Sequence, residues 1–367
     1  MGKKYKAIDL FAGCGGLSSG FIKGGFQIIS AVEIDNQIAA TLQNNHPGTL
    51  VFQKDIGEVA SKDLLSDHSN VDVIAGGPPC QGFSMSGKRI RDNGKFLNDP
   101  RNYLFREFFR VVKDLQPKVF IIENVPGILN IQGGAIRENI LEIFNNIGYQ
   151  TSFKVLLASE YGVPQNRRRA YFIGNNLGID SKDLFPEKTH GNGLESFVTI
   201  EDAIFDLPFI KHGKGTFKTT YTKDPISDYQ SYLRKGSQFL YNHVSSLHDE
   251  NTLKILSLIK EGKGMKDLPE EFHTKSRHSG AYGRMLRNYP AYTITTRFDT
   301  PSVGRVTHPL INRSITPREA ARIQSFHDSF IFYGSKSSIG KQIGNAIPPL
   351  LAYKISKKIL KLLDNKF

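Results

Sequence analysis

Cys80 stands in a turn whose residue types suit a nucleophile. Residues 76–84 read GGPPCQGFS and directly follow an apolar run that predicts a strand. Two glycines and two prolines make a rigid turn, which would present one thiol beyond the end of that strand. A reactive thiolate needs exposure and positive neighbours, and Lys88 and Arg89 follow closely in the sequence. Because a cysteine that only packs would lie within the apolar run rather than after it, the pattern predicts that Cys80 is a reactive thiol.

A carboxylate and a basic run lie next to two further predicted strands. Glu123 comes directly after the apolar residues 119–122, and a carboxyl group leaving such a strand is desolvated. Desolvation raises the pKa of a carboxyl group, so Glu123 could act as an acid; the alternative is a capping or structural carboxylate. Residues 165–169 read QNRRR, and the planar guanidinium groups of Arg167 and Arg169 suit a base oxygen or a carboxylate. The alternative for this run is a solvated charge cluster.

A glycine-rich loop and two acidic residues indicate a nucleoside site. Residues 9–16 read DLFAGCGG, between a predicted strand and a predicted helix, where open α/β sheets bind ligands. The spacing is not G-x-G-x-x-G, so it does not favour a pyrophosphate, but its glycines permit close backbone approach to a nucleoside. Glu33 follows about 20 residues later and suits ribose hydroxyls, and Asp55 follows a third strand and suits an adenine edge. Each acid alone is more often a surface or cap residue, whereas the set predicts an adenosine-type cofactor, with Cys14 as a packing residue.

These residues need a sheet that brings strand ends together, and the first half of the chain predicts one. Short apolar runs alternate with helical patterns, as expected for a mostly parallel sheet covered by helices. The predicted strands are 6–11, 27–32, 50–53, 71–75, 119–122, 151–157 and 170–174, and the predicted helices include 103–115 and 136–147. From about 177 to 315 the pattern is irregular, with helical periodicity only in 252–260. Order returns with a helix start at Thr316 and a last helix after Pro349.

The composition limits the class of protein. The 367 residues suggest two domains, and the net charge of +13 favours a polyanionic partner, although a merely soluble basic protein has the same balance. Two cysteines make neither a disulfide framework nor a four-thiolate metal site. The apolar runs are too short for a membrane span, and the N-terminus does not read as a signal peptide. We therefore expect a cytoplasmic protein with no metal and no membrane partner.

Taken together, the motifs and their order resemble those of the DNA cytosine-5 methyltransferase family of bacterial restriction–modification systems. The matching residues are 9–20, Glu33, Asp55, 79–81, 123–125, 165–169, 318–324 and 342–345. Only about 180–312 lacks shared motifs, and residues 293–297 within it resemble a small recurring element of the family's variable domain. The resemblance implies an α/β, Rossmann-like, S-adenosylmethionine-dependent methyltransferase fold with a mostly parallel sheet. It also implies a catalytic and cofactor-binding domain at 1–177, a smaller, irregular target-recognition domain at 178–315, and a segment at 316–367 that returns to the catalytic domain.

The resemblance also implies roles for particular residues. Cys80 would add to carbon 6 of a flipped-out cytosine in double-stranded DNA, and Glu123 would bond the ring nitrogen and the exocyclic amine. Arg169, supported by Arg167, would hold the base oxygen. S-adenosylmethionine would give its methyl group and leave as S-adenosylhomocysteine, held by Phe11, Gly13, Gly15, Glu33, Ile34, Asp55, Ile56, Pro79, Leu104 and Asn345. DNA contacts would come from a lid at 84–98 and from the recurring element, through Ser84, Ser86, Lys88, Arg89, Thr295 and Arg297.

The sequence leaves neighbouring functions open. A tRNA cytosine methyltransferase of the same fold is the first alternative, and the long distinct stretch 178–315 favours a DNA reader over it. A non-catalytic DNA-binding relative is disfavoured because Cys80, Glu123 and the glycine-rich loop are all present. A small-molecule methyltransferase would have no use for the net charge of +13. We therefore expect a monomeric modification enzyme for double-stranded DNA, with any cognate restriction endonuclease acting separately.

Overall fold

The computed structural model describes residues 5–79, 102–274, 276 and 280–366 of the chain. Packing divides the chain into two compact units. The first unit comprises Met1–Leu157, Arg168–Glu187 and Ala352–Phe367, and the second comprises Ala158–Arg167 and Lys188–Leu351. Residues 316–351 therefore pack with the second unit, and the return to the first unit begins at Ala352. The predicted boundaries at 178 and 316 separate a catalytic domain from a target-recognition domain and from a C-terminal segment. This division stays a prediction.

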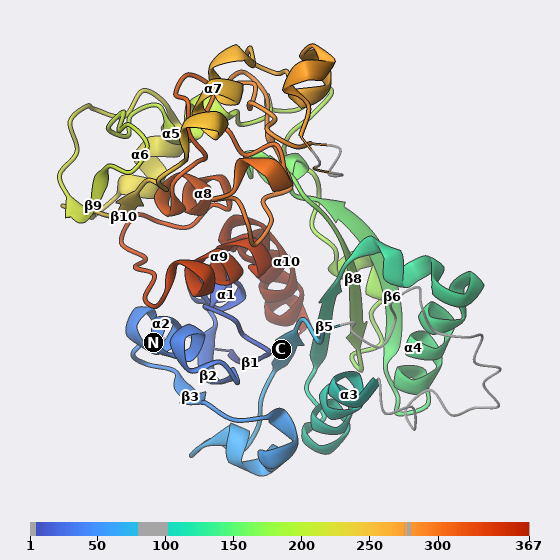
Figure 1. Ribbon diagram of the computed structural model, residues 1–367. Coiled ribbons are helices and arrows are strands. Elements are labelled where there is room, and N and C mark those ends of the chain that lie inside the picture. Colours follow the sequence, from blue (N-terminus) through green and yellow to red (C-terminus); the bar gives the residue numbers. More distant parts are fainter. Residues whose placement is uncertain (1–4, 80–101, 275, 277–279, 367) are drawn as a thin grey trace. The chain divides into compact units, whose positions relative to one another are not determined.

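The first unit is built on a seven-stranded sheet (Figure 1). Its strands are β1 (Lys6–Leu10), β2 (Gln27–Val32), β3 (Leu50–Phe52), β4 (Val73–Gly76), β5 (Val119–Asn124), β6 (Gln150–Leu157) and β8 (Arg168–Asn175). Their spatial order is β3-β2-β1-β4-β5-β8-β6. Neighbours among β1 to β5 pair in parallel, whereas β8 is antiparallel to both β5 and β6. The predicted mostly parallel sheet is confirmed, and its strands lie close to their expected bounds.

Helices cover both faces of this sheet (Figure 1). One face carries α3 (Tyr103–Leu115) and α4 (Ala135–Asn145), whose apolar side chains form a core with the strands. Within this core the rings of Phe120 and Phe144 stack with their centroids 3.9 Å apart. The other face carries α1 (Gly16–Gly24), α2 (Asn36–Asn45) and α10 (Pro349–Lys366). No helix in the described part of the chain is both long and apolar enough to cross a membrane.

The second unit consists of short elements joined by long loops. Its helices are α5 (Ile200–Ile204), α6 (Asp228–Arg234), α7 (Glu250–Leu258), α8 (Pro317–Ile323) and α9 (Lys336–Asn345). Its two-stranded sheets pair β9 (Gly215–Thr219) with β10 (Leu240–Val244), and β7 (Gln165–Asn166) with β11 (Ala291–Tyr292). Only α7 and α8 were expected here. α9 was not expected although it has ten residues, because Gly340 and Gly344 are poor helix formers. The cap predicted at Thr316 is confirmed, since its hydroxyl accepts the N–H of Glu319 at 3.1 Å.

Candidate active site

The predicted functional residues of the first unit meet at one edge of the sheet. Because β3, β2, β1, β4 and β5 are neighbours and parallel, their carboxyl ends lie side by side. Ligands of open α/β sheets bind at this edge. The glycine-rich loop follows β1, Glu33 follows β2, Asp55 comes soon after β3, Gly77 follows β4, and Glu123 lies at the end of β5. Motifs that are far apart in the sequence thus form a continuous row.

The loop after β1 has a backbone conformation that favours glycine. Gly13 and Gly15 have φ angles of +56° and +92°, in the left-handed region. A Cβ atom on Gly15 would lie 2.6 Å from Leu42, so this glycine lets α1 and α2 approach each other. A Cβ atom on Gly13 would meet no atom within 4 Å, so the backbone there borders open space. Cys14 is buried, as predicted for a packing residue, and burial raises the pKa of its thiol.

Glu33 fixes this loop with its carboxylate. Its Oε2 accepts the N–H of Gly13 at 2.9 Å, and its Oε1 accepts the N–H of Asp35 at 2.9 Å. Burial raises the pKa of Glu33, although these two hydrogen bonds act in the opposite direction. Each carboxylate oxygen has two lone pairs, so it can still accept a further hydrogen bond from a sugar hydroxyl. Ile34, directly after it, is 64% exposed and leaves an apolar surface beside the carboxylate.

Asp55 is held by Tyr103, a residue to which the sequence motifs assign no role. The Oδ1 atom of Asp55 accepts the Tyr103 hydroxyl at 2.9 Å and the N–H of Gly57 at 2.9 Å. Neither bond uses Oδ2. A Cβ atom on Gly57 would lie 1.8 Å from the Tyr103 hydroxyl oxygen, so a larger residue there would displace this hydroxyl from Asp55. Of the other predicted cofactor contacts in this region, Leu104 is partly buried and Ile56 belongs to the core.

Asn124 holds the turn that leads to Cys80. Its Nδ2 donates to the carbonyl oxygen of Pro78 at 3.1 Å, and both groups are buried. The backbone of Gly77 runs close to Glu123, because a Cβ atom on Gly77 would lie 3.3 Å from the Glu123 carboxylate. Asn124 follows Glu123 in its motif, but no pattern in the sequence assigned it a role. The structure shows that it ties the end of β5 to the chain at Pro78.

Several predicted residues lie outside the described part of the chain. They are Cys80, Ser84, Ser86, Lys88 and Arg89, together with the rest of the predicted lid. Pro79, a predicted cofactor contact, is the last described residue before them and is exposed. Among the described residues, no three His, Cys, Asp or Glu side chains come together as metal ligands would. The roles of the undescribed residues and the absence of a metal stay predictions.

Glu123 and Arg169 form an ion pair at the site. The Nε atom of Arg169 lies 3.0 Å from Oε1 of Glu123, and the two side chains are 17% and 12% exposed. The antiparallel pairing of β5 with β8 brings them together. Glu123 is opposite Tyr171 in the register, and Arg169, two residues before Tyr171 on β8, projects from the same face of the sheet. A carboxyl group and a guanidinium side by side can both bond one planar heterocycle. The carboxyl group can bond the N–H groups and the ring nitrogen of the heterocycle, and the guanidinium can donate to its carbonyl oxygen. The structure therefore brings these two predicted catalytic residues together.

Arg167 lies elsewhere, although it is only two residues from Arg169. Its side chain belongs to the second unit, is 2% exposed, and donates through Nη1 to the carbonyl oxygen of Ile294 at 3.4 Å. Beside it, the N–H of Ile294 donates to the Oε1 atom of Gln165 at 2.8 Å. These bonds join the QNRRR run to the recurring element at 293–297. Support of the bound base by Arg167 stays a prediction.

The remaining predicted residues of the second unit lie on its surface. Thr295, Arg297 and Asn345 are exposed, and the side chain of Arg297 is 63% exposed. The backbone at Thr295 is packed against α9, since a Cβ atom on Gly344 would lie 2.5 Å from the Thr295 carbonyl carbon. Asn345 is the last residue of that helix. Contacts of these residues with DNA or with a cofactor stay predictions.

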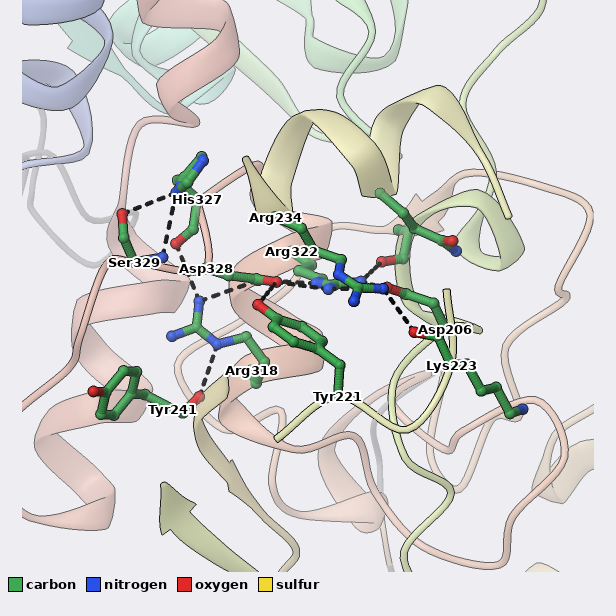
Figure 2. Close-up of polar contacts among 12 residues, drawn as sticks. Asp206, Tyr221, Lys223, Arg234, Tyr241, Arg318, Arg322, His327, Asp328 and Ser329 are labelled. Atoms are coloured by element: carbon green, nitrogen blue, oxygen red, sulfur yellow. Dashed lines mark hydrogen bonds and ion pairs between the residues drawn. The ribbon is translucent and has the colours of Figure 1, made fainter. Parts of the chain in front are cut away.

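The motif at 318–324 builds the interior of the second unit (Figure 2). Arg318 and Arg322 of α8 are fully buried. Arg322 bonds two carboxylates, that of Asp206 and that of Asp328, the latter at 2.9 and 2.6 Å. Burial acts to raise the pKa of Asp328, but the guanidinium groups of Arg322 and Arg318 outweigh it and hold the pKa below its ordinary value. Arg318 also donates to the backbone carbonyl oxygens of Tyr241, His327 and Phe330.

Comparison with solved structures supports the fold. A structure described as a putative DNA modification methyltransferase encoded within a prophage, from E. coli, has a TM-score of 0.78 and 30% identity, with 98% of this chain and 100% of that chain covered. The Dnmt2 methyltransferase of S. pombe has a TM-score of 0.64 at 18% identity, covering 98% of this chain and 99% of that chain. At that identity the second likeness shows the fold alone.

Comparison with protein sequences extends to the whole chain. The model of the C-5 cytosine-specific DNA methylase family matches residues 5–361. The Type II methyltransferase M.DdeI of Desulfomicrobium norvegicum is 38% identical, over 98% of this chain and 89% of that protein. The Type II methyltransferase M1.HphI of Haemophilus parahaemolyticus is 37% identical, over 98% and 87%. With the row of motifs at the sheet edge, these matches show that the chain belongs to the C-5 cytosine-specific DNA methylase family and is an S-adenosylmethionine-dependent DNA (cytosine-5-)-methyltransferase.

Proposed function

We propose that this methyltransferase modifies one cytosine within a specific double-stranded DNA sequence and thereby protects that DNA from a separately acting restriction endonuclease. The support is that relatives matching nearly the whole chain carry the name Type II methyltransferase. Residues 178–315 would read the sequence. The enzyme would act as a monomer in the cytoplasm.

The residues at the edge of the first unit fit S-adenosylmethionine. The open space beside Gly13 accepts close approach of a ligand, and the Glu33 carboxylate suits the two hydroxyls of a ribose. The Oδ2 atom of Asp55 is available for the amine of adenine. When bound, this cosubstrate supplies an electrophilic methyl group on a sulfonium and becomes S-adenosylhomocysteine. Apolar contacts would come from Phe11, Ile34, Pro79 and Leu104, and Asn345 of the C-terminal segment would add a polar contact.

Cys80 would overcome the poor nucleophilicity of carbon 5 of cytosine. As a thiolate it would form a bond to carbon 6, and the displaced electron pair would make carbon 5 nucleophilic. Carbon 5 would take the methyl group and then give its proton to water acting as a base. The pair left by that proton would re-form the double bond between carbons 5 and 6 as Cys80 leaves carbon 6 as a thiolate. The proton on the ring nitrogen would return to Glu123, which restores the aromatic ring. The base must leave the stacked duplex for this chemistry, at a cost of a few kcal/mol.

Glu123 and Arg169 would hold and activate the flipped base. As a carboxylic acid, Glu123 would donate its proton to the ring nitrogen and accept a hydrogen bond from the exocyclic amine. Arg169 would donate to the base oxygen, and Asn124 would keep the nucleophile turn in place through Pro78. The ion pair of Glu123 with Arg169, next to that turn, is the observation that carries this assignment.

The covalent step can be tested with the two cysteines of the chain. Cys80→Ser should abolish methyl transfer, measured as tritium incorporation into duplex DNA, while DNA binding remains. A duplex with 5-fluorocytosine at the target should trap wild-type enzyme covalently, because the fluorine cannot leave as a proton does. Cys14→Ser is the matched control, since Cys14 is a buried packing residue, and this variant should still be trapped. Turnover by Cys80→Ser would refute the covalent role of Cys80.

The target can be found by bisulfite sequencing of DNA from cells that express the chain. Modification confined to one short sequence would support a sequence-specific enzyme. Tritium transfer to tRNA in place of duplex DNA would contradict the proposed double-stranded DNA substrate. Exchange of residues 178–315 for those of a relative should transfer the relative's target, and an active hybrid with unchanged sites would place recognition elsewhere.

A further inference from the structure

Tyr292 is an exposed aromatic side chain that the mechanism above does not use. It is the last residue of β11 and is 63% exposed. The chain after it is anchored by Ile294, which is 1% exposed, while Thr295 and Arg297 lie on the surface. Tyr292 therefore lies on the same exposed stretch as two residues that the family resemblance assigns to DNA.

The strand β11 places Tyr292 next to the chain that leads to Arg169. Tyr292 pairs with Asn166 in the parallel register of β11 and β7. The Oγ1 atom of Thr293 donates to the carbonyl oxygen of Asn166 at 3.0 Å, which further joins the end of β11 to β7. Arg169 follows Asn166 in the QNRRR run. The backbone of Tyr292 is thus paired with the start of the QNRRR run, which carries Arg169, the arginine proposed to hold the base.

A fixed cation covers one face of the Tyr292 ring. The guanidinium carbon of Arg305 lies 5.0 Å from the ring centroid, a cation–π distance. Arg305 is held in place because its Nη1 donates to the carbonyl oxygen of Gly262 at 2.7 Å. Its stem is packed against Gly283, where a Cβ atom would lie 2.7 Å from the Arg305 Cγ. Tyr292 and Arg305 together form an ordered platform, flat, aromatic and positively charged.

We propose that this platform binds double-stranded DNA by stacking the uncovered face of the Tyr292 ring on a deoxyribose, and so positions the strand whose cytosine Arg169 receives. Sugars carry no sequence information and remain accessible in a duplex, so this contact would hold the strand whatever its base sequence. The charge of Arg305 suits the phosphate backbone nearby. Tyr292 is thus a positioning residue. The inference rests on the proposed function, since it takes the substrate of the QNRRR run to be DNA.

The test compares Tyr292→Ala, Tyr292→Phe and a matched control, Tyr289→Ala. Tyr289 is 59% exposed and lies in the same segment, but no cation among the described residues covers its ring. The dissociation constant for a short fluorescent duplex is measured by anisotropy with S-adenosylhomocysteine present, at several salt concentrations. The duplex carries the sequence found by bisulfite sequencing, and a mixed-sequence duplex is measured in parallel. The dissociation constant for S-adenosylmethionine is measured by calorimetry.

We expect Tyr292→Ala to weaken binding of the duplex about tenfold and Tyr292→Phe to restore it, because stacking needs the ring and not the hydroxyl. The cofactor affinity and the slope of log affinity against log salt should not change, because no phosphate-neutralising charge is removed. Tyr289→Ala should bind like wild type. Equal losses in Tyr292→Ala and Tyr289→Ala, or no loss in either, would overturn the proposal.

A second measurement does not depend on a substitution. Duplexes with 5-iodouracil beside the target are irradiated with wild-type enzyme, and the cross-linked peptides are identified by mass spectrometry. A cross-link to Tyr292 supports the proposal, and cross-links confined to other segments overturn it. If wild-type enzyme binds the duplex but methylates no cytosine, the proposed function fails, and both measurements still decide whether Tyr292 contacts DNA.

Discussion

The two units of this chain place arginine–carboxylate pairs in different environments. In the first unit Glu123 and Arg169 form an ion pair, and both side chains keep some exposed surface. In the second unit Arg322 contacts the carboxylates of Asp206 and Asp328, and none of the three is exposed (Figure 2). Every side-chain nitrogen of Arg322 already has a partner within the protein.

This difference shows that membership of a motif does not assign a residue to the chemistry. An arginine whose donors are all used inside the protein has none left for a substrate. Removing Arg322 would take a shared cation from two buried carboxylates, although Arg234 stays near Asp206 and Arg318 stays near Asp328. An arginine with one ion pair at the edge of the sheet can exchange that partner for a base. Burial and the use of side-chain donors therefore separate an arginine that is bound within the protein from one that remains accessible to a substrate.

Glu123→Gln should have the largest effect on activity. The amide keeps the shape of the side chain but has no acidic proton to give, so the rate of methyl transfer should fall by about 10²–10⁴-fold. The unfolding temperature and the affinity for S-adenosylmethionine should change little. The control is Glu138→Gln, which removes a carboxylate that is 61% exposed and paired with Arg137 at 2.6 Å, and it should keep the wild-type rate. A Glu123→Gln enzyme with wild-type rate would remove Glu123 from the catalytic residues.

Arg322→Met should instead act on stability. It takes the shared cation from two buried carboxylates, which keep Arg234 and Arg318 as remaining partners. Breaking a buried ion pair costs up to about 3–5 kcal/mol when no other cation remains, so we expect a loss within that limit. Urea unfolding should show a clear loss in the midpoint, with loss of soluble expression as its extreme form. Arg287→Met is the matched control, because Arg287 is 42% exposed and its ion pair with Glu261 is at the surface. Similar midpoints for the two variants would contradict the structural role of the buried arginine.

Asn124→Ala tests a residue between these two extremes. It is buried like Arg322, but its side chain makes two hydrogen bonds: it donates to the carbonyl oxygen of Pro78 and accepts the N–H of Val125 at 2.8 Å. Loss of these bonds costs about 1–3 kcal/mol of stability, whereas misplacing the proposed nucleophile lowers the rate of methyl transfer. We expect kcat to fall about tenfold with KM for DNA nearly unchanged. A fall in stability with an unchanged kcat would make Asn124 a purely structural residue.

Asp9→Asn concerns a buried acid of the first unit, and its expected effect is confined to the pH dependence of stability. Burial raises the pKa of Asp9 to about 7, although the hydrogen bond from Ser18 at 2.6 Å lowers it. A raised pKa means that the contribution of protonated Asp9 is fully present below its unfolded pKa of 3.8 and is lost as the pH rises toward 7. The stability of Asp9→Asn relative to wild type should therefore grow between pH 4 and 7 and level off above. Thermal unfolding at several pH values checks this, and a difference independent of pH would contradict the raised pKa.

The amino-acid sequence alone determined the order of the motifs and the edge on which they meet. Apolar runs alternating with helical patterns specify a parallel sheet, and parallel strands place their carboxyl ends together. Glu33, Asp55 and Glu123 could therefore be assigned to one site from their positions after predicted strands, and the structure confirms their common edge. Local patterns suffice there, because each strand and the residue after it are read from a few neighbouring positions.

Only the tertiary structure decided which charged side chains are buried with partners inside the protein and which remain accessible to a substrate. Arg322 meets Asp206 across 116 positions of sequence, Arg167 meets Ile294 across 127, and Tyr103 meets Asp55 across 48. A run of arginines has the same local pattern whether its side chains face solvent, a substrate or a buried carboxylate. Burial depends on contacts between segments that are distant in the chain, and for that reason the roles of these arginines could not be separated from the sequence.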